Sequence, residues 1–402
     1  MREGQLLSVL RLCSVFEPPR RLPLDRVAGF DPIGGMQSHT AKLTRALDRL
    51  GVRQKVVTSH LPGAPAREQL GDHTEILRLG WPIQGLRQLY SLPAALHLLR
   101  VGGSADLVHV HLGEDLAVVP LGLMAASIHH LPMVLTIHCS LGHTFRGRGL
   151  RAFALRTLGA RLERLGTRRA SAVIVLTKRL ERALERLVDP VRLHVIPSGV
   201  DRELFRGPFA DPLPDLPHPR VLFVGRLAPQ KGVLRLLRAM PMLLPDAHLV
   251  LVGDGPQRSK VEAEIDRMGL RERVHLTGFA HHHHVPAYLA HADVLALPSV
   301  YEELGSVLVE AIQSGIPIVA SRTGGISEVV EDGREGLLVD AGDRLALAGA
   351  VNRLLHDSEL TARLSTGAQA SAARYDWQEL AREVLALYHR VTAPLGPSEA
   401  RA

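Results

Sequence analysis

Two basic side chains follow an apolar run in the second half of the chain, in the sequence VLFVGRLAPQKG. Arg226 comes just after the run, and Lys231 lies five residues later, directly before Gly232. If a strand ends and a helix begins here, both cations face one point, where they would stabilise the growing charge of a diphosphate leaving group. Arg226 can hold two phosphate oxygens, while Lys231 acts as a point charge. The alternative is a turn with two solvated charges, but Lys231 is one of only five lysines beside 43 arginines, which favours a binding role.

Two glutamates flank a second turn, in the sequence YEELGSVLVEAIQSGIPIVAS, which follows the apolar run ADVLALPS. Gly305 permits a close approach of the backbone, and a helix starting near Ser306 would direct its free amides, those of Ser306 and Val307, at a phosphate. Glu310, one turn into that helix, can accept both hydroxyls of a ribose, and Glu302 can reach sugar hydroxyls. This pattern favours a sugar nucleotide over charged residues that merely flank a helix.

The elements that position these residues follow from apolar runs that alternate with amphipathic segments, as is typical of parallel strands joined by crossover helices. In the first half we expect strands at Leu6–Leu12, Arg53–Thr58, Asp106–His111, Met133–His138, Ala172–Thr177 and Arg192–Pro197. In the second half we expect them at Val221–Gly225, His248–Gly253, Arg273–Gly278, Asp293–Pro298, Ile316–Ser321 and Gly336–Val339. A helix is expected in most intervals, for example Gly35–Leu50. The fold class is therefore α/β, with two doubly wound Rossmann-like sheets that share a ligand cleft.

The 402 residues exceed the usual size of a single core, which predicts two domains. The segment RGPFADPLPDLPHPR carries five prolines and no periodicity, so we place a linker at 206–219. The N-terminal domain is then 1–205 and the C-terminal domain 220–376. The end of the chain, 377–402, reads as a helix and a frayed tail, and we expect it to pack back on the N-terminal domain.

Composition limits the partners. The net charge of +7 comes from arginines spread along the chain, which indicates no nucleic-acid partner. The densest basic segment, Arg146–Arg169, could be an amphipathic helix on a membrane surface, although a solvated helix face is the simpler interpretation. Two cysteines, Cys13 and Cys139, predict no disulfide framework and no structural metal site, and no cofactor is expected. With no signal peptide and no apolar span, the sequence favours a cytoplasmic protein.

Taken as a set, GRLAPQKG, VGDGP, GF and PSVYEELGSVLVEAIQSGIPIVAS closely resemble the retaining glycosyltransferases of family 4, which have the two-domain GT-B fold. The resemblance spans essentially the whole chain. It implies that Arg226 and Lys231 bind the donor diphosphate and that Glu310 binds the ribose. It places Glu302 and the backbone of 304–307 against the sugar and phosphates, and Phe279 and Ala280 beside the base. The sequence departs from the common family pattern at Leu304, usually Phe, and at Ser198, usually Asn.

In the N-terminal domain, the resemblance implies that the Gly34-Gly35 loop approaches the donor phosphates and the acceptor, although a lone Gly-Gly pair is a weak signal. His138, at the end of MVLTIH, matches the family position where a histidine faces the donor sugar. A lone histidine at a strand end is otherwise more often structural. Four residues are candidates for contacting the acceptor: Asp31, His111, Glu114 and Asp115. The run His281–His284 is assigned no role.

The activity that the resemblance implies is transfer from a nucleotide sugar, with retention and without a metal. The segment DPIGGMQSHTAKLTRALDRLGVRQKVVTSHLPG is similar to enzymes that place N-acetylglucosamine on 2-deoxystreptamine in aminoglycoside antibiotic biosynthesis. This predicts UDP-GlcNAc as the donor and a small hydroxyl acceptor. The alternatives are a membrane-surface transferase with a lipid or polysaccharide acceptor, and a nucleotide-sugar 2-epimerase, which would turn over the donor without an acceptor.

Overall fold

The computed structural model describes residues 6–17, 35–82, 89–113, 115–138 and 150–393. Contacts within the chain divide it into two units. The first unit comprises Met1–Pro197 together with Gln378–Ala402, and the second comprises Ser198–Trp377. Each unit is built around a sheet of its own, so each has its own core.

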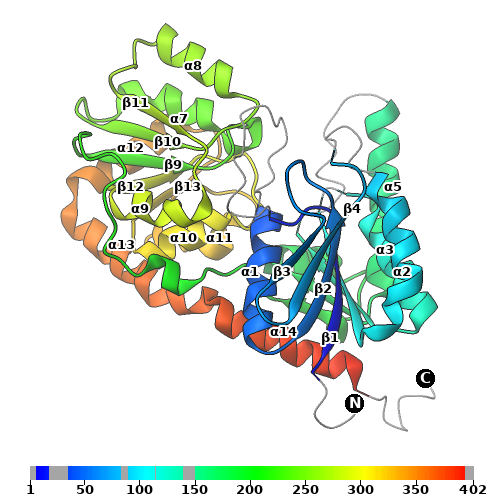
Figure 1. The fold of residues 1–402 in the computed structure, drawn as a ribbon. Helices are drawn as coiled ribbons and strands as arrows, with labels where there is room; N and C mark the ends of the chain where they lie inside the picture. Colours follow the sequence, from blue (N-terminus) through cyan, green and yellow to red (C-terminus); the bar gives the residue numbers. More distant parts are fainter. Residues whose placement is uncertain (1–5, 18–34, 83–88, 114, 139–149, 394–402) are drawn as a thin grey trace. The chain divides into compact units, whose positions relative to one another are not determined.

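The first unit contains an eight-stranded sheet in the order β3-β4-β2-β1-β5-β6-β7-β8 (Figure 1). Its strands are β1 (Ser8–Cys13), β2 (Arg53–Ser59), β3 (Arg67–Leu70), β4 (Thr74–Leu79), β5 (Leu107–Leu112), β6 (Met133–Ile137), β7 (Ala172–Val175) and β8 (Leu193–Val195). Every residue of β5, β6 and β7 is buried, as expected for strands covered on both faces. The six strands predicted for this half are confirmed.

Strands β3 and β4 were not predicted. Both lie at one edge of the sheet, where β4 pairs parallel to β2 and β3 pairs antiparallel to β4. Every residue of β3 is at least partly exposed, and charged residues such as Glu75 and Arg78 interrupt the apolar pattern of β4. An edge hairpin of this kind lacks the continuous apolar run by which buried parallel strands are recognised. The first sheet is therefore mixed at its edge rather than wholly parallel.

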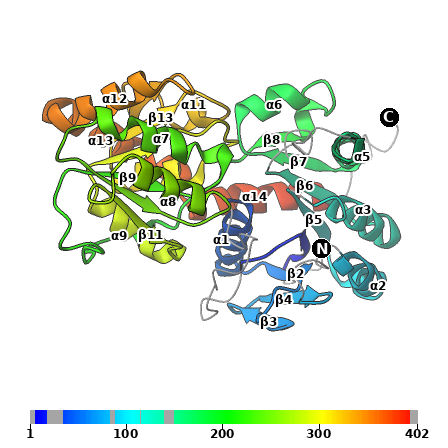
Figure 2. The ribbon, with the colours of Figure 1, turned by 90° about the horizontal axis from the view of Figure 1, so that it is seen from above.

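Helices cover both faces of the first sheet (Figure 2). On one face lie α1 (Gly35–Arg49) and α14 (Trp377–Thr392); on the other lie α2 (Ser91–Val101), α3 (Val118–His129) and α5 (Leu150–Arg169), and the short α6 (Lys178–Leu184) follows β7. Helix α14 turns Leu380, Val384 and Tyr388 inward, and all three are buried. Helix α14 therefore contributes these side chains to the core of the first unit.

The second unit contains a six-stranded parallel sheet in the order β11-β10-β9-β12-β13-β14. Its strands are β9 (Arg220–Val224), β10 (His248–Val252), β11 (Val274–Gly278), β12 (Val294–Leu297), β13 (Ile318–Ser321) and β14 (Gly336–Val339). Its helices are α7 (Val233–Ala239), α8 (Arg258–Arg267), α9 (Val285–Ala290), α10 (Ser306–Ser314), α11 (Ile326–Val329), α12 (Arg344–His356) and α13 (Ser358–Ser371). The strand order reverses between β9 and β12, and such a switch point is where open parallel sheets bind ligands.

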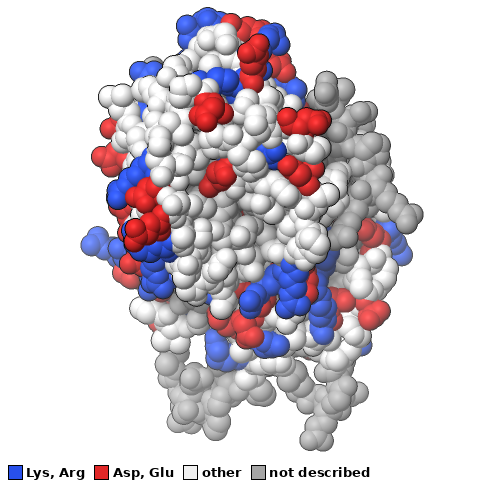
Figure 3. All heavy atoms as spheres, turned by 90° about the vertical axis from the view of Figure 1, so that its left-hand side faces the viewer, with Lys and Arg blue, Asp and Glu red and all other residues white. Residues whose placement is uncertain are grey.

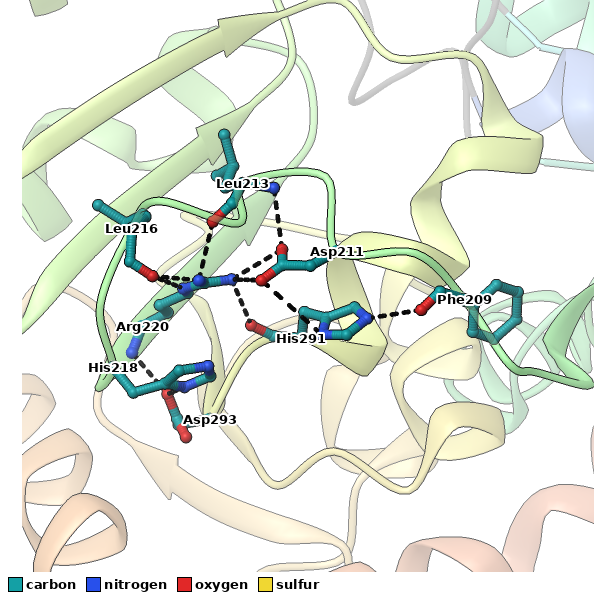
Figure 4. Close-up of polar contacts among 8 residues, drawn as sticks. All are labelled: Phe209, Asp211, Leu213, Leu216, His218, Arg220, His291 and Asp293. Carbon is teal, nitrogen blue, oxygen red and sulfur yellow. Dashed lines mark hydrogen bonds and ion pairs between the residues drawn. The ribbon is translucent and has the colours of Figure 1, made fainter.

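The proline-rich segment 206–219 groups with the second unit, whose boundary falls between Pro197 and Ser198 rather than within this segment. Arg220, at the start of β9, holds the segment in place (Figure 4). Its buried guanidinium donates to both carboxylate oxygens of Asp211 at 2.9 Å and to the carbonyl of Leu213, also at 2.9 Å. The segment is therefore a strap bonded to the sheet, which its composition alone did not indicate.

Charges of both signs mix on the surface. On the face drawn in Figure 3, basic and acidic side chains lie among one another, and neither sign covers the face alone. Helix α5, within the basic segment Arg146–Arg169, exposes Phe153, Leu158 and Leu165. Across the described ranges, every helix is too short or too polar to cross a bilayer.

Candidate active site

The loops after β9 and β12 bring Lys231 and Glu302 together at the switch point of the second sheet. Lys231 Nζ lies 2.6 Å from Glu302 Oε1, and the same oxygen accepts from Ser299 Oγ at 2.9 Å. Glu302 is 6% exposed, so its charge is compensated by these donors rather than by water. The two residues are 71 positions apart in sequence, and the pairing joins the basic motif to the acidic one.

Arg226 lies on the first of these loops, just after β9, and is partly buried. Its guanidinium makes no hydrogen bond or ion pair with any residue in the described part of the chain. Arginine carries five donors in a rigid fork and is always charged, so this guanidinium, on the loop that also carries Lys231, can bind an anion.

Gly232 lets the first loop approach the second. It has a φ of 69°, and a Cβ at this position would lie 2.0 Å from the carbonyl oxygen of Pro298, which follows β12. Any other residue would push the two loops apart. The glycine that follows Lys231 is therefore what allows the lysine to reach Glu302.

The N-terminus of α10 opens beside Glu302. Gly305 has a φ of 80° and precedes the first helical residue, Ser306, as predicted, and no side chain caps this end. The amides of Ser306 and Val307 therefore keep their hydrogen-bonding capacity for a ligand, which the helix dipole makes favourable for an anion. Leu304 is buried at the preceding position, where it packs instead of presenting a ring.

Glu310 lies on α10 and is 4% exposed. Its Oε1 is 3.4 Å from Nε2 of His282, in the turn that precedes α9. The histidine run His281–His284 was assigned no role from the sequence, so this neighbour was missed. The signal that could have found it is its position three residues after Phe279, which the sequence analysis predicted to lie beside the base. Phe279 is 38% exposed, and its ring lies 5.4 Å from that of His281.

In the first unit, His138 follows β6 and is part of a buried polar cluster. Its Nε2 lies 3.0 Å from Nδ1 of His111 on β5, and Nε2 of His111 lies 3.2 Å from a guanidinium nitrogen of Arg11 on β1. His39, on α1, packs edge-on against His138 with ring centroids 4.5 Å apart. Burial lowers the pKa of His138 to about 3 and the pKa values of His39 and His111 well below their usual value. All three rings are therefore neutral at pH 7.

The cluster continues to the C-terminal helix. The second terminal nitrogen of Arg11 donates to the hydroxyl of Tyr388 on α14 at 3.1 Å. That hydroxyl lies 2.6 Å from Nδ1 of His109, whose Nε2 is 2.7 Å from Oγ1 of Thr136. All four side chains are buried, and neither Arg11 nor Tyr388 was identified as a site residue from the sequence.

Comparisons with known proteins decide the family. Residues 33–204 match the family described as Glycosyltransferase Family 4, and residues 209–371 match Glycosyl transferases group 1. A 2-deoxystreptamine glucosyltransferase from Streptomyces kanamyceticus is 34% identical over 89% of this chain and 99% of that protein. The chain belongs to glycosyltransferase family 4. A 2-deoxystreptamine N-acetyl-D-glucosaminyltransferase from Streptomyces fradiae is 32% identical to this transferase over 83% of this chain and 85% of that protein.

Solved structures support the fold of the transferase. Sucrose-phosphate synthase from Thermosynechococcus elongatus aligns with a TM-score of 0.81 at 24% identity, over 96% of this chain and 99% of that chain. HepE from Anabaena, solved in complex with UDP-glucose, aligns with a TM-score of 0.75 at 23% identity, over 96% of this chain and 100% of that chain. The transferase therefore has the GT-B fold, as the sequence predicted.

One residue expected to contact an acceptor is engaged within the transferase itself. Asp115 is 1% exposed; one carboxylate oxygen accepts from the hydroxyl of Tyr90 at 2.6 Å and the other from the amide of Ala117 at 2.8 Å. Asp115 is therefore a buried carboxylate just before α3, and its contact with an acceptor stays a prediction. His111 is also fully buried, so it reaches a ligand only through His138.

Three of the predicted site residues, Asp31, Gly34 and Glu114, lie outside the described residues. Gly35 is the first residue of α1, and Ala280 follows β11 directly after Phe279.

Proposed function

We propose that this transferase moves N-acetylglucosamine from UDP-N-acetylglucosamine to a hydroxyl of 2-deoxystreptamine, with retention of configuration at the anomeric carbon. The observations that carry the donor half are the Lys231–Glu302 pair and the guanidinium of Arg226, which lies on the same loop as Lys231 and has no partner among the described residues. The acceptor half is supported by relatives from Streptomyces kanamyceticus and Streptomyces fradiae, whose names both specify 2-deoxystreptamine. Their names differ in the sugar, so the experiment must compare both sugars.

In this proposal the second unit binds the nucleotide. Arg226 and Lys231 neutralise the diphosphate, and the amides at the start of α10 complete its coordination. Glu310 accepts hydrogen bonds from the ribose hydroxyls, with Phe279 beside the base. Glu302 is held by Lys231 and Ser299, so its second oxygen is fixed in place for a hydroxyl of the sugar.

Retention requires the acceptor to attack the face of the sugar from which the diphosphate departs. The bond between the anomeric carbon and the diphosphate oxygen breaks, and a bond from the acceptor oxygen forms. The proton of the acceptor hydroxyl passes to an oxygen of the departing diphosphate, which acts as the general base. Fixed cations at Arg226 and Lys231 favour this step because they stabilise charge that develops only as the bond breaks.

On the acceptor side, 2-deoxystreptamine carries amines that are cationic at neutral pH, so carboxylates are the residues suited to bind it. Because both oxygens of Asp115 are engaged, Asp31 and Glu114 remain the proposed acceptor ligands. His138 is proposed to face the donor sugar near the reacting carbon.

The test incubates the purified protein, without added metal, with 2-deoxystreptamine and either UDP-N-acetylglucosamine or UDP-glucose. Mass spectrometry identifies the product, and the proton coupling of its anomeric position gives the configuration. We expect the α-linked N-acetylglucosaminyl product, lost in Lys231→Ala and retained in Lys260→Ala, which removes an exposed lysine of α8. A glucosyl product would overturn the donor assignment. Donor consumption without an acceptor would indicate a 2-epimerase.

One observation favours a second acceptor class. The exposed Phe153, Leu158 and Leu165 of α5 lie within the arginine-rich segment, and such a helix can rest on anionic lipid. Binding to vesicles that contain anionic lipid, reversed by salt, would favour a membrane acceptor over 2-deoxystreptamine.

A further inference from the structure

Arg11 is a buried cation in the middle of the first sheet. It lies on β1, is fully buried, and has no carboxylate within ion-pair distance in the described part of the chain. A charge buried away from water destabilises the folded protein unless hydrogen bonds satisfy its donors. Its terminal nitrogens bond to uncharged partners, His111 and Tyr388. An arginine kept at this cost is a candidate for a role beyond packing.

The direction of each hydrogen bond from Arg11 to His138 follows from chemistry. Arginine has donors and no acceptor, so Nε2 of His111, at 3.2 Å, must accept. A neutral His111 then carries its proton on Nδ1 and donates it to Nε2 of His138, at 3.0 Å. Nε2 of His138 is therefore a lone pair, and the proton of His138 must be on Nδ1. That Nδ1 has no hydrogen-bond partner among the described residues, so it remains available to a ligand.

The second terminal nitrogen of Arg11 makes a separate hydrogen bond. It donates to the hydroxyl of Tyr388, which also lies within hydrogen-bond distance of Nδ1 of His109, at 2.6 Å. Nε2 of His109 lies 2.7 Å from Oγ1 of Thr136. Both terminal nitrogens of the arginine are therefore engaged in hydrogen bonds, and the bond to His111 is independent of the bond to Tyr388.

The same histidines raise the question of a metal. The ligand atoms of His39, His111 and His138 all lie within 4.8 Å of one another. For Nδ1 of His111 to bind a metal, its proton would have to move to Nε2, where it would point at an N–H of Arg11. A metal would also add charge beside a buried guanidinium that has no carboxylate to offset it. The arginine therefore favours the hydrogen-bonded series Arg11–His111–His138, called the relay below, over a metal site.

We propose that Arg11 is a positioning residue that fixes, through His111, the tautomer of His138, so that His138 presents Nδ1–H as a hydrogen-bond donor. The proposal rests on the proposed function only in assigning the donor sugar as the group that accepts this bond. With the other tautomer, Nδ1 of His138 would carry a lone pair. It could then donate no hydrogen bond to an oxygen of the donor sugar. A group behind a histidine commonly sets its tautomer and orientation in this way.

The tautomer can be read directly by long-range ¹H–¹⁵N correlation spectra of the full-length protein labelled at histidine. The His138 signals are assigned by their loss in His138→Gln. We expect the proton on Nδ1 in the wild type and in Arg11→Lys, which keeps a donor, and a shift to Nε2 or a mixture in Arg11→Met. Tyr388→Phe leaves the bond from Arg11 to His111 in place and should keep the wild-type tautomer.

A proton on Nε2 of His138 in the wild type overturns the proposal, and this reading does not depend on whether Arg11→Met folds. An unchanged tautomer in a folded Arg11→Met also overturns it. Addition of Zn²⁺ alone is the control for a metal: broadening of the three histidines at micromolar zinc would contradict the relay.

Transfer kinetics separate this inference from the proposed function. If His138 donates to the sugar, Arg11→Met lowers kcat by about 10²-fold, the cost of one lost donor in an active site, with partial rescue in Arg11→Lys. If the tautomer of His138 changes in Arg11→Met while kcat does not, the relay is supported. The proposed contact of His138 with the donor sugar is then overturned.

Discussion

At the scale of single residues, the candidate site was predictable where charge and spacing are unusual. Arg226, Lys231, Glu302 and Glu310 are recognisable because each follows an apolar run or flanks a glycine turn. The residues that contact these four side chains cannot be recognised from the sequence. Ser299, which donates to Glu302, and His282, beside Glu310, are ordinary in sequence and acquire meaning only from the loops that place them.

The buried carboxylate Glu302 gives the first prediction. Glu302→Gln keeps the size of the side chain but leaves Lys231 beside a neutral amide. The ion pair that positions the lysine is then lost. We expect kcat/KM for the donor to fall by about 10²-fold or more, since a charge-assisted bond to the sugar and a positioning contact are lost together. Glu262→Gln, on the exposed surface of α8, is the matched control. Steady-state kinetics with equal activity in both variants would refute the assignment.

The buried histidines predict how stability depends on pH. Burial lowers the pKa of His138 to about 3 from 6.5, so the unfolded chain binds a proton that the folded chain does not. The folded state is therefore progressively destabilised as pH falls from about 6.5 toward 3, by about 1.4 kcal/mol per pH unit for each such histidine. Above pH 6.5 this contribution is constant.

Urea unfolding between pH 7.5 and 5 measures that slope. His109→Gln removes one of the histidines whose pKa burial lowers, and we expect a slope smaller by about one proton. His356→Gln, which replaces an exposed side chain, should leave the slope unchanged. Equal slopes in the two variants would mean that the buried rings do not carry the pH dependence.

At the scale of elements, apolar periodicity identified the strands that are buried on both faces. It failed for β3 and β4, where the edge of the sheet is partly exposed and the pattern is broken by charges. It also could not show that Tyr388 on α14 would meet Arg11 on β1, since 377 residues separate them and each looks like an ordinary helix or strand residue. Contacts between distant elements depend on how the chain packs, which local patterns do not record.

Gly232 gives a prediction at this scale. In Gly232→Ala the new methyl would lie 2.0 Å from the carbonyl oxygen of Pro298, so the loops after β9 and β12 must separate. Gly269→Ala is a matched control, because its φ of 64° is close to the 69° of Gly232 but nothing lies within 4 Å of the new methyl. Both variants share about 1–2 kcal/mol of backbone strain. Only Gly232→Ala should lose donor binding in a titration; equal loss in both would assign the effect to strain alone.

At the scale of the whole molecule, two sheets and the family were evident from the sequence, because two series of apolar runs meet at a proline-rich segment. The nature of that segment was not evident. Prolines suggested a linker, yet Arg220, 4% exposed at its side chain, bonds the segment to the second unit through Asp211 and two carbonyls. The role of such a segment becomes visible only from the residues that bond to it, and these lie on β9 and in the neighbouring loops.

Asp211→Asn tests the strap. It leaves the buried guanidinium of Arg220 without its carboxylate, and we expect the second unit to lose about 3–5 kcal/mol of unfolding free energy. Arg206→Ala removes an ion pair with Glu203 that is exposed at both side chains, and should cost less than about 1 kcal/mol. Differential scanning calorimetry of both variants checks this. Similar losses would show that Arg220 does not hold the segment.

The central claim is that the loops after β9 and β12 bind the diphosphate of the donor. Calorimetric titration of UDP, without metal, into wild type, Arg226→Met and Arg238→Met tests it most directly, because Arg238 is an exposed arginine of α7 that pairs with Glu264. We predict that Arg226→Met weakens binding at least about tenfold, as expected for a charge-assisted bond, while Arg238→Met binds like wild type. If wild type binds no UDP, or if the two variants bind it equally, the donor site is not where we place it.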